Sequence, residues 1–197
     1  MKTTFLSIRF LCFLLGALLF ARTESIATPL VVSRDPTRIE LAVQREAKDK
    51  IEGGDWDDKI ERVRLEVTVT NKTLNGPPLE GYQLQCWAIA KQIKDPKAYE
   101  VVVAETVPIR LTSEAQGRQI VHKTEEVKWG WDDTGAIWGK KYQGWIVLVL
   151  NAKGEMVACK SSNPMWEQTI AAKADGLKLN QDYTSKLDPS TSAPGRR

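Results

Sequence analysis

The sequence predicts an all-β fold, a seven-stranded antiparallel β-sandwich with a short C-terminal helix. Apolar and polar residues alternate with a period of two along much of the chain, and residues 62–70 show this most clearly. Such alternation is typical of strands that have one buried and one solvated face. Clusters of glycine, proline and asparagine separate the runs, as at 75–78. Several strands joined by turns at this spacing indicate a sandwich.

The first 27 residues are expected to be a cleavable secretory signal. Lys2 and Arg9 precede an apolar run of 11 residues, Phe10 to Phe20, and small residues follow it. A membrane-spanning helix needs about 20 apolar residues, so this run is short for a span. A basic start and a short apolar run are the pattern of a signal peptide. We therefore expect a secreted or periplasmic protein with no stable membrane span after cleavage.

Charge argues against a nucleic-acid partner. The whole chain has 28 basic and 25 acidic residues, and removal of residues 1–27 leaves 25 basic and 24 acidic residues. The chain also lacks an arginine-rich run or a basic helix stripe. The usual electrostatic footprint of a nucleic-acid-binding protein is therefore missing.

The expected strands follow a linker at residues 28–36 and belong to one domain, 37–175. Their approximate ranges are 38–44, 62–70, 82–92, 99–111, 119–129, 142–150 and 156–161. The run 142–150 is apolar almost throughout, which suits a strand buried on both faces. Pro108 cannot donate to a ladder, so 99–111 is expected to be an edge strand or two short strands. Residues 151–154 have the composition of a hairpin turn.

A short helix and a disordered tail are expected to end the chain. Asn163 can cap a helix over 164–174, and Pro164 suits its first turn. Residues 176–197 are mostly polar, so we expect a disordered tail there.

With the seven runs in this order, the chain resembles an immunoglobulin or fibronectin type III domain in architecture. Trp87 lies on the third run, where immunoglobulin domains carry a core tryptophan, and Tyr142 has the spacing of a tyrosine corner. Val67 and Gly144 occupy the neighbourhoods of that family's paired cysteines. In such a sandwich Cys86 and Cys159 would flank one strand, too far apart for a disulfide.

Four of the seven tryptophans fall within residues 129–145, so this stretch is either core or contact surface. The sandwich topology would bring the links 48–59 and 130–141 to the same end of the molecule. Candidate ligand-binding residues there are Trp56, Trp131 and Trp138. Candidate Ca²⁺ ligands are Asp55, Asp57, Asp58, Asp132 and Asp133, because Ca²⁺ takes six to eight oxygens. The alternative is that the tryptophans plug the end of the core and the aspartates cap turns.

Asp133-Thr134-Gly135 also matches the catalytic triplet of retroviral-type aspartic proteases, which the chain resembles over four residues. The residue before the catalytic aspartate should be apolar, and here it is Asp132. An Asx-type turn is therefore favoured over a protease site. His122 is the single histidine, and no serine has a Gly-x-Ser-x-Gly context.

We accordingly expect a binding or interaction module and no enzyme. A protein or a carbohydrate is the expected partner, and a carbohydrate-binding module that uses the three tryptophans is the first alternative. An aspartic-protease-type enzyme is the second.

Overall fold

The computed structural model describes residues 39–132, except 52–58, together with 134, 137–171 and 176–189. The expected signal peptide and linker lie outside the described residues. Nine strands and one helix are present: β1 (Ile39–Ile51), β2 (Lys59–Asn71), β3 (Leu79–Gln92), β4 (Tyr99–Leu111), β5 (Gln119–Lys123), β6 (Val127–Asp132), β7 (Trp138–Leu150), β8 (Met156–Ser161), α1 (Pro164–Ala171) and β9 (Asp182–Tyr183). The expected all-β class is confirmed, and the described residues form nine strands, where seven were predicted.

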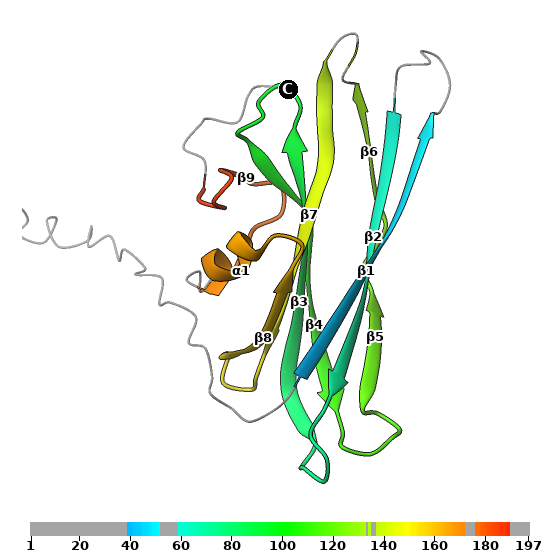
Figure 1. Ribbon diagram of the computed structural model, residues 1–197, viewed down its shortest axis with the longest axis vertical. Coiled ribbons are helices and arrows are strands. Elements are labelled where there is room, and N and C mark those ends of the chain that lie inside the picture. The colour runs from blue at the N-terminus through cyan, green and yellow to red at the C-terminus, as the bar shows by residue number, and fades with distance from the viewer. Residues whose placement is uncertain (1–38, 52–58, 133, 135–136, 172–175, 190–197) are drawn as a thin grey trace, which may run out of the picture.

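All strand pairs are antiparallel, and they form two groups that meet at β7 (Figure 1). The first group pairs β1 with β2, and β2 in turn with β5 and β6. The second group has the order β8-β7-β3-β4-β9. Only the first two residues of β7, Trp138 and Gly139, pair with β6. Strand β7 therefore leaves the first group at its start and continues in the second.

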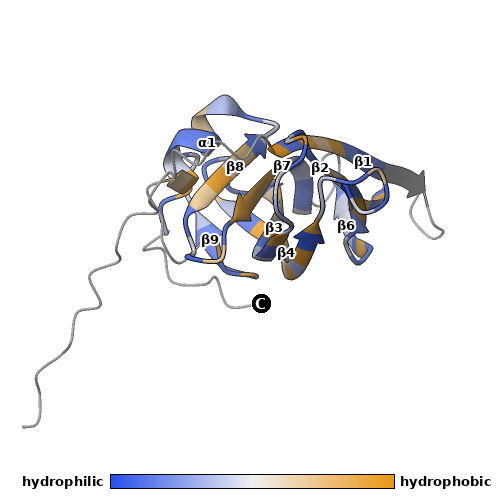
Figure 2. Cartoon of the chain, turned by 90° about the horizontal axis from the view of Figure 1, so that it is seen from below, coloured by the Kyte–Doolittle hydropathy of each residue, from blue (hydrophilic) through white to orange (hydrophobic). Residues whose placement is uncertain are grey.

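One face of each group contributes to a shared hydrophobic core. Burial alternates along β2, where Val63, Leu65, Val67 and Val69 are fully buried. These side chains belong to the same cluster as Leu84 and Cys86 of β3 and Val147 and Val149 of β7. The alternation in the sequence therefore reports which face of β2 is inside. Figure 2 shows the same pattern as alternating hydropathy along β1.

A second core covers the opposite face of β3 and β7. Ile89, Ile146 and Leu148 pack there with Trp166 and Ile170 of α1. The expected burial on both faces is therefore confirmed for 146–150, whereas Gln143 is exposed. Trp87 also belongs to this second core, whereas the resemblance to immunoglobulin domains implied a place between the two groups.

The expected disordered tail is wrong for residues 176–189. This segment forms β9, which pairs with β4, and it buries Leu177, Tyr183 and Leu187 in the second core. The backbone carbonyl oxygen of Leu177 accepts a hydrogen bond of 2.9 Å from the indole of Trp87. The segment is thus part of the domain because it covers apolar side chains that β3 and β7 present outward.

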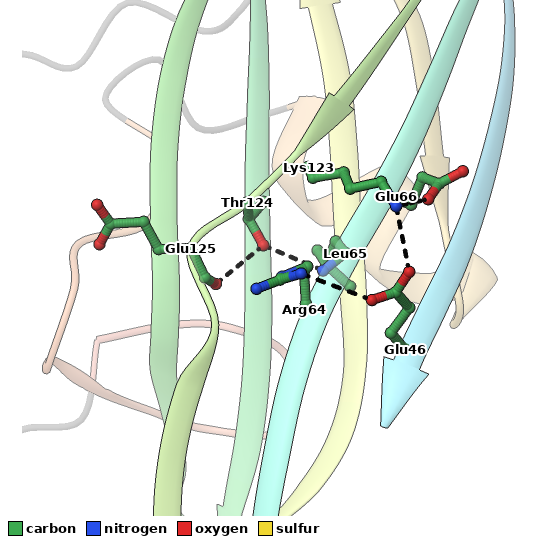
Figure 3. Close-up of polar contacts among 7 residues, drawn as sticks. All are labelled: Glu46, Arg64, Leu65, Glu66, Lys123, Thr124 and Glu125. Carbon is green, nitrogen blue, oxygen red and sulfur yellow. Dashed lines mark hydrogen bonds and ion pairs between the residues drawn. The ribbon is translucent and has the colours of Figure 1, made fainter. Parts of the chain in front are cut away.

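The run expected as one strand at 119–129 is interrupted between β5 and β6. Both pieces pair with β2, one after the other. At the break, Thr124 takes over the pairing with Leu65: its Oγ1 accepts from the Leu65 amide at 3.0 Å, and its own amide donates to the Leu65 carbonyl at 3.0 Å (Figure 3). The backbone amide and carbonyl of Leu65 therefore remain hydrogen-bonded across the gap between β5 and β6.

Smaller expectations at turns and edges are also confirmed. Asn163 caps α1, since its Oδ1 accepts from the Met165 amide at 3.1 Å. Asn151 organises the β7–β8 turn by accepting from the amides of Lys153 and Glu155. Pro108 lies on β4, whose pairing with β9 involves only its first two residues, so the proline occupies an edge.

Cys86 and Cys159 are free thiols, as predicted. Strand β7 lies between them, since Val147 pairs with Cys86 and Leu148 with Cys159. Burial raises the pKa of each thiol to about 12, with a further increase from Glu105 at Cys86 and from Glu167 at Cys159.

We expect both thiols to react slowly with an aromatic disulfide reagent at pH 8, because the thiolate is the reactive form. The native protein should show little reaction over minutes, and the protein unfolded in guanidinium should react fully. The control is a Cys159→Ser variant, which assigns any residual native reactivity to one thiol. Rapid native reaction of Cys86 would contradict its burial.

Candidate functional site

Three interstrand connections gather at one end of the molecule, and two of them, β1–β2 and β6–β7, correspond to the links 48–59 and 130–141 that the sandwich topology placed together. Lys59 pairs with both Ile51 and Trp131, so the β1–β2 and β6–β7 connections share this end. Gln92 pairs with Lys140, and the Ile93 amide donates to the Gly139 carbonyl at 3.1 Å, which adds the β3–β4 connection. We call this end, comprising Lys59, residues 91–98 and the described part of 131–141, the pole. It lies at the top of Figure 1.

The tryptophans predicted to form a binding platform have different environments. Trp56 lies outside the described residues. Trp131 is part of β6, only 4% exposed, and the ammonium groups of Lys59 and Lys141 each lie 4.4 Å from its ring centroid. Its ring is therefore covered, as the plug alternative describes, and does not offer a flat exposed face.

Trp138 is the exposed indole of the described pole. It is 38% exposed and begins β7 next to Ile137, which is 45% exposed. A Cβ atom added to Gly130 would lie 2.6 Å from Cη2 of Trp138. One side of the indole therefore lies against the β6 backbone, where a larger residue than glycine would displace it. The remaining surface is available to a partner.

Of the five candidate metal ligands, the structure describes only Asp132. It is 4% exposed, and its Oδ1 accepts from the Thr134 amide at 2.7 Å and from the Thr134 hydroxyl at 2.9 Å. This is an Asx-type turn, with Asp132 as the acceptor where the sequence suggested Asp133. Asp55, Asp57, Asp58 and Asp133 lie outside the described residues. Within the part of the chain that the structure describes, no three candidate ligands cluster, and the Ca²⁺ site stays a prediction.

The pole also contains a hollow that the sequence did not reveal. It has a volume of about 300 Å³ and is lined by Lys91, Gln92, Ile93, Pro96, Lys141 and Gln143. Lys91 and Lys141 are directly opposite each other in the β3–β7 register. Like charges in that position are unfavourable. The two lysines are far apart in the sequence, so only the strand register brings them together.

Next to the hollow, a third lysine, Lys140, forms an ion pair with a carboxylate. Nζ of Lys140 lies 2.6 Å from Oε1 of Glu100, which is 7% exposed, and the Gln92 amide donates to the same carboxylate at 2.7 Å. Asp182 pairs with Glu100 between β9 and β4. Burial, and then the Glu100 charge, raise the pKa of Asp182.

We expect Asp182→Asn to stabilise the protein at pH 7. When folding raises the pKa of a carboxyl group, its ionised form destabilises the folded protein. This destabilisation is present at pH values above the folded-state pKa. It disappears as the pH falls below the unfolded-state value. Opposed like charges in a sheet cost about 0.2–1 kcal/mol, and we expect a gain of that size in urea unfolding at pH 7 and none at pH 3. Equal gains at both pH values would contradict the electrostatic origin.

His122, the single histidine, is engaged in a structural contact. Its Nε2 lies 2.9 Å from Oε2 of Glu105, which connects β5 of the first group to β4 of the second. The other oxygen of Glu105 accepts from the Glu125 amide at 2.7 Å. Glu105 is the β4 partner of Cys86. The raised pKa of the Cys86 thiol makes this cysteine a poor nucleophile.

No family model and no curated protein sequence matches the chain. Among solved structures, the chain is similar to a protein from Akkermansia muciniphila, with 12% sequence identity and a TM-score of 0.30. That similarity covers 66% of this chain and 73% of the other. In the described residues, no helix has the length and apolar character needed to cross a membrane.

Proposed function

We propose that this chain is a secreted or periplasmic, non-catalytic binding module whose ligand binds at the pole. The N-terminal sequence supports the location, because residues 1–27 have the pattern of a secretory signal. We further propose that the two strand groups form an immunoglobulin-like sandwich. Their shared core and the strand order β8-β7-β3-β4 support this architecture.

The hollow is the observation that carries the binding proposal. It is concave, it combines apolar surface from Ile93 and Pro96 with four polar side chains, and it lies beside the β3–β4 connection. Small-molecule sites have these properties. The raised pKa of both thiols and the structural contact of His122 support the non-catalytic assignment.

Amide NMR of the isotopically labelled protein tests this proposal. A collection of soluble glycans and peptides is titrated, and ligands are expected to shift amides of 91–98 and 138–143. The matched control is Lys153→Gln, an exposed lysine of the β7–β8 turn, which should leave binding unchanged. Ligands that shift only amides remote from the pole would contradict the proposal.

Carbohydrate binding is the favoured form of this function, and the exposed indole of Trp138 supports it. Trp138→Ala is the suitable variant, because Trp131→Ala would also remove a buried core side chain. If a glycan binds the Trp138→Ala variant as tightly as it binds the parent protein, Trp138 is not part of the binding site.

A further inference from the structure

Two lysines line the hollow without a carboxylate partner among the described residues, and the ammonium group of one of them, Lys141, lies 4.4 Å from the Trp131 ring centroid. Three lysines elsewhere are matched with carboxylates: Lys140 with Glu100, Lys123 with Glu66 at 2.6 Å, and Lys72 with Glu40. Among the described residues, neither Lys91 nor Lys141 forms an ion pair, although they are directly opposite each other. An anion between them would relieve the repulsion.

The remaining lining favours a ring with hydroxyl groups over a bare anion. Ile93 and Pro96 supply apolar surface, which a small inorganic anion would leave uncovered. Gln143 is exposed and offers both a donor and an acceptor. The Gln92 nitrogen already donates to Glu100, so its carboxamide oxygen is left as an acceptor. No arginine lines the hollow, so the bidentate recognition typical of phosphate is missing there.

We propose that the hollow binds a carboxylate-bearing sugar ring, the uronic-acid class of saccharide. The carboxylate lies between Lys91 and Lys141, the carbon face of the ring packs on Ile93 and Pro96, and Gln143 contacts hydroxyl groups. A volume of about 300 Å³ suits one such ring and is at the small end of ligand sites. This inference rests on the proposed function, because it names the ligand class of the same pole.

Calorimetry and amide NMR with an oligogalacturonide test the inference. The matched ligand is the same oligosaccharide with its carboxyl groups reduced to alcohols, and inorganic phosphate is the third probe. We expect the acidic oligosaccharide to bind and shift amides of 91–98 and 138–143, with the two other probes much weaker. The double variant Lys91→Gln/Lys141→Gln should weaken binding about tenfold or more, a change of about 1.4 kcal/mol.

The control variant, Lys153→Gln/Lys178→Gln, removes the same charge from exposed lysines away from the hollow. It should bind as the parent does, and an equal loss in both double variants would show general attraction and overturn the inference. Equal binding of the reduced sugar or of phosphate would also overturn it. Shifts at the pole with another ligand and none with the acidic sugar would leave only the proposed function standing. The proposed function also fails if no ligand shifts the pole.

Discussion

A chain that ends at Asp175 is expected to lose about 5 kcal/mol of stability and to melt far below the full-length protein. The truncation removes Leu177, Tyr183 and Leu187, which are 5%, 3% and 0% exposed. Burying one large apolar side chain contributes about 1.5–3 kcal/mol, so the three together approach the whole stability of a typical domain, about 5–15 kcal/mol. Circular dichroism and tryptophan fluorescence during heating measure the loss.

Two indole hydrogen bonds disappear with the same segment. Trp87 loses the Leu177 carbonyl, and Trp166 loses the Ser185 carbonyl at 3.2 Å. The control is a chain that ends at Pro189, which should melt as the full-length protein does. Should the shorter chain not fold, Leu187→Ala still tests the prediction, with an expected cost of about 2–5 kcal/mol. A truncation at Asp175 that melts within a few degrees of the parent would contradict the role of the segment.

The sequence contained an indirect signal for this cover. The runs around Trp87 and Ile146 are apolar on both faces, and a strand of that kind needs a layer on each side. The covering segment itself was hidden, because its three buried residues are irregularly spaced among polar ones and have no helical or strand period. The apolar faces of β3 and β7 predict that some segment must cover them, but the sequence did not reveal which residues form that segment.

The rest of the fold could be predicted where a strand has one buried and one exposed face. Strand β2 is the clearest case, since alternate residues from Val63 to Val69 are fully buried. The break at Thr124 was missed because a threonine that replaces ladder bonds with its side chain looks like any β-forming residue. Local composition cannot distinguish a hydroxyl that faces solvent from one that pairs with a backbone amide.

The candidate site depended on register, which the sequence left open. Lys91 meets Lys141 only because the β3–β7 ladder has an irregularity between Ile89 and Ala90 that shifts the pairing. Trp131 was expected in the link 130–141. It instead belongs to β6, where it pairs with Gly139, and its indole is buried. A shift of one residue changes the face of a strand, so neither placement follows from composition.

Glu61→Ala is expected to destabilise the protein strongly, because it removes a buried carboxylate near the pole. Glu61 is 4% exposed, its Oε2 accepts from the Tyr142 amide at 2.8 Å, and its Oε1 lies 3.4 Å from the Arg45 guanidinium. The guanidinium also lies 4.1 Å from the Tyr142 ring centroid. The substitution leaves the Tyr142 amide without its acceptor, and a donor left without a partner inside a protein costs about 1–3 kcal/mol.

The buried carboxylate connects β2 of the first group to β7 just before β7 enters the second core, so its loss acts on the joint between the groups. Tyr142 reports on the same environment, because burial raises the pKa of its phenol. Glu61→Gln keeps an acceptor for the Tyr142 amide and should lose less stability than Glu61→Ala. Arg45→Gln alters the partner that is one-third exposed and should lose less still, since exposed partners contribute little. Urea unfolding gives the three values, and a Glu61→Ala loss no larger than that of Arg45→Gln would contradict a dominant contribution from the Glu61–Tyr142 hydrogen bond.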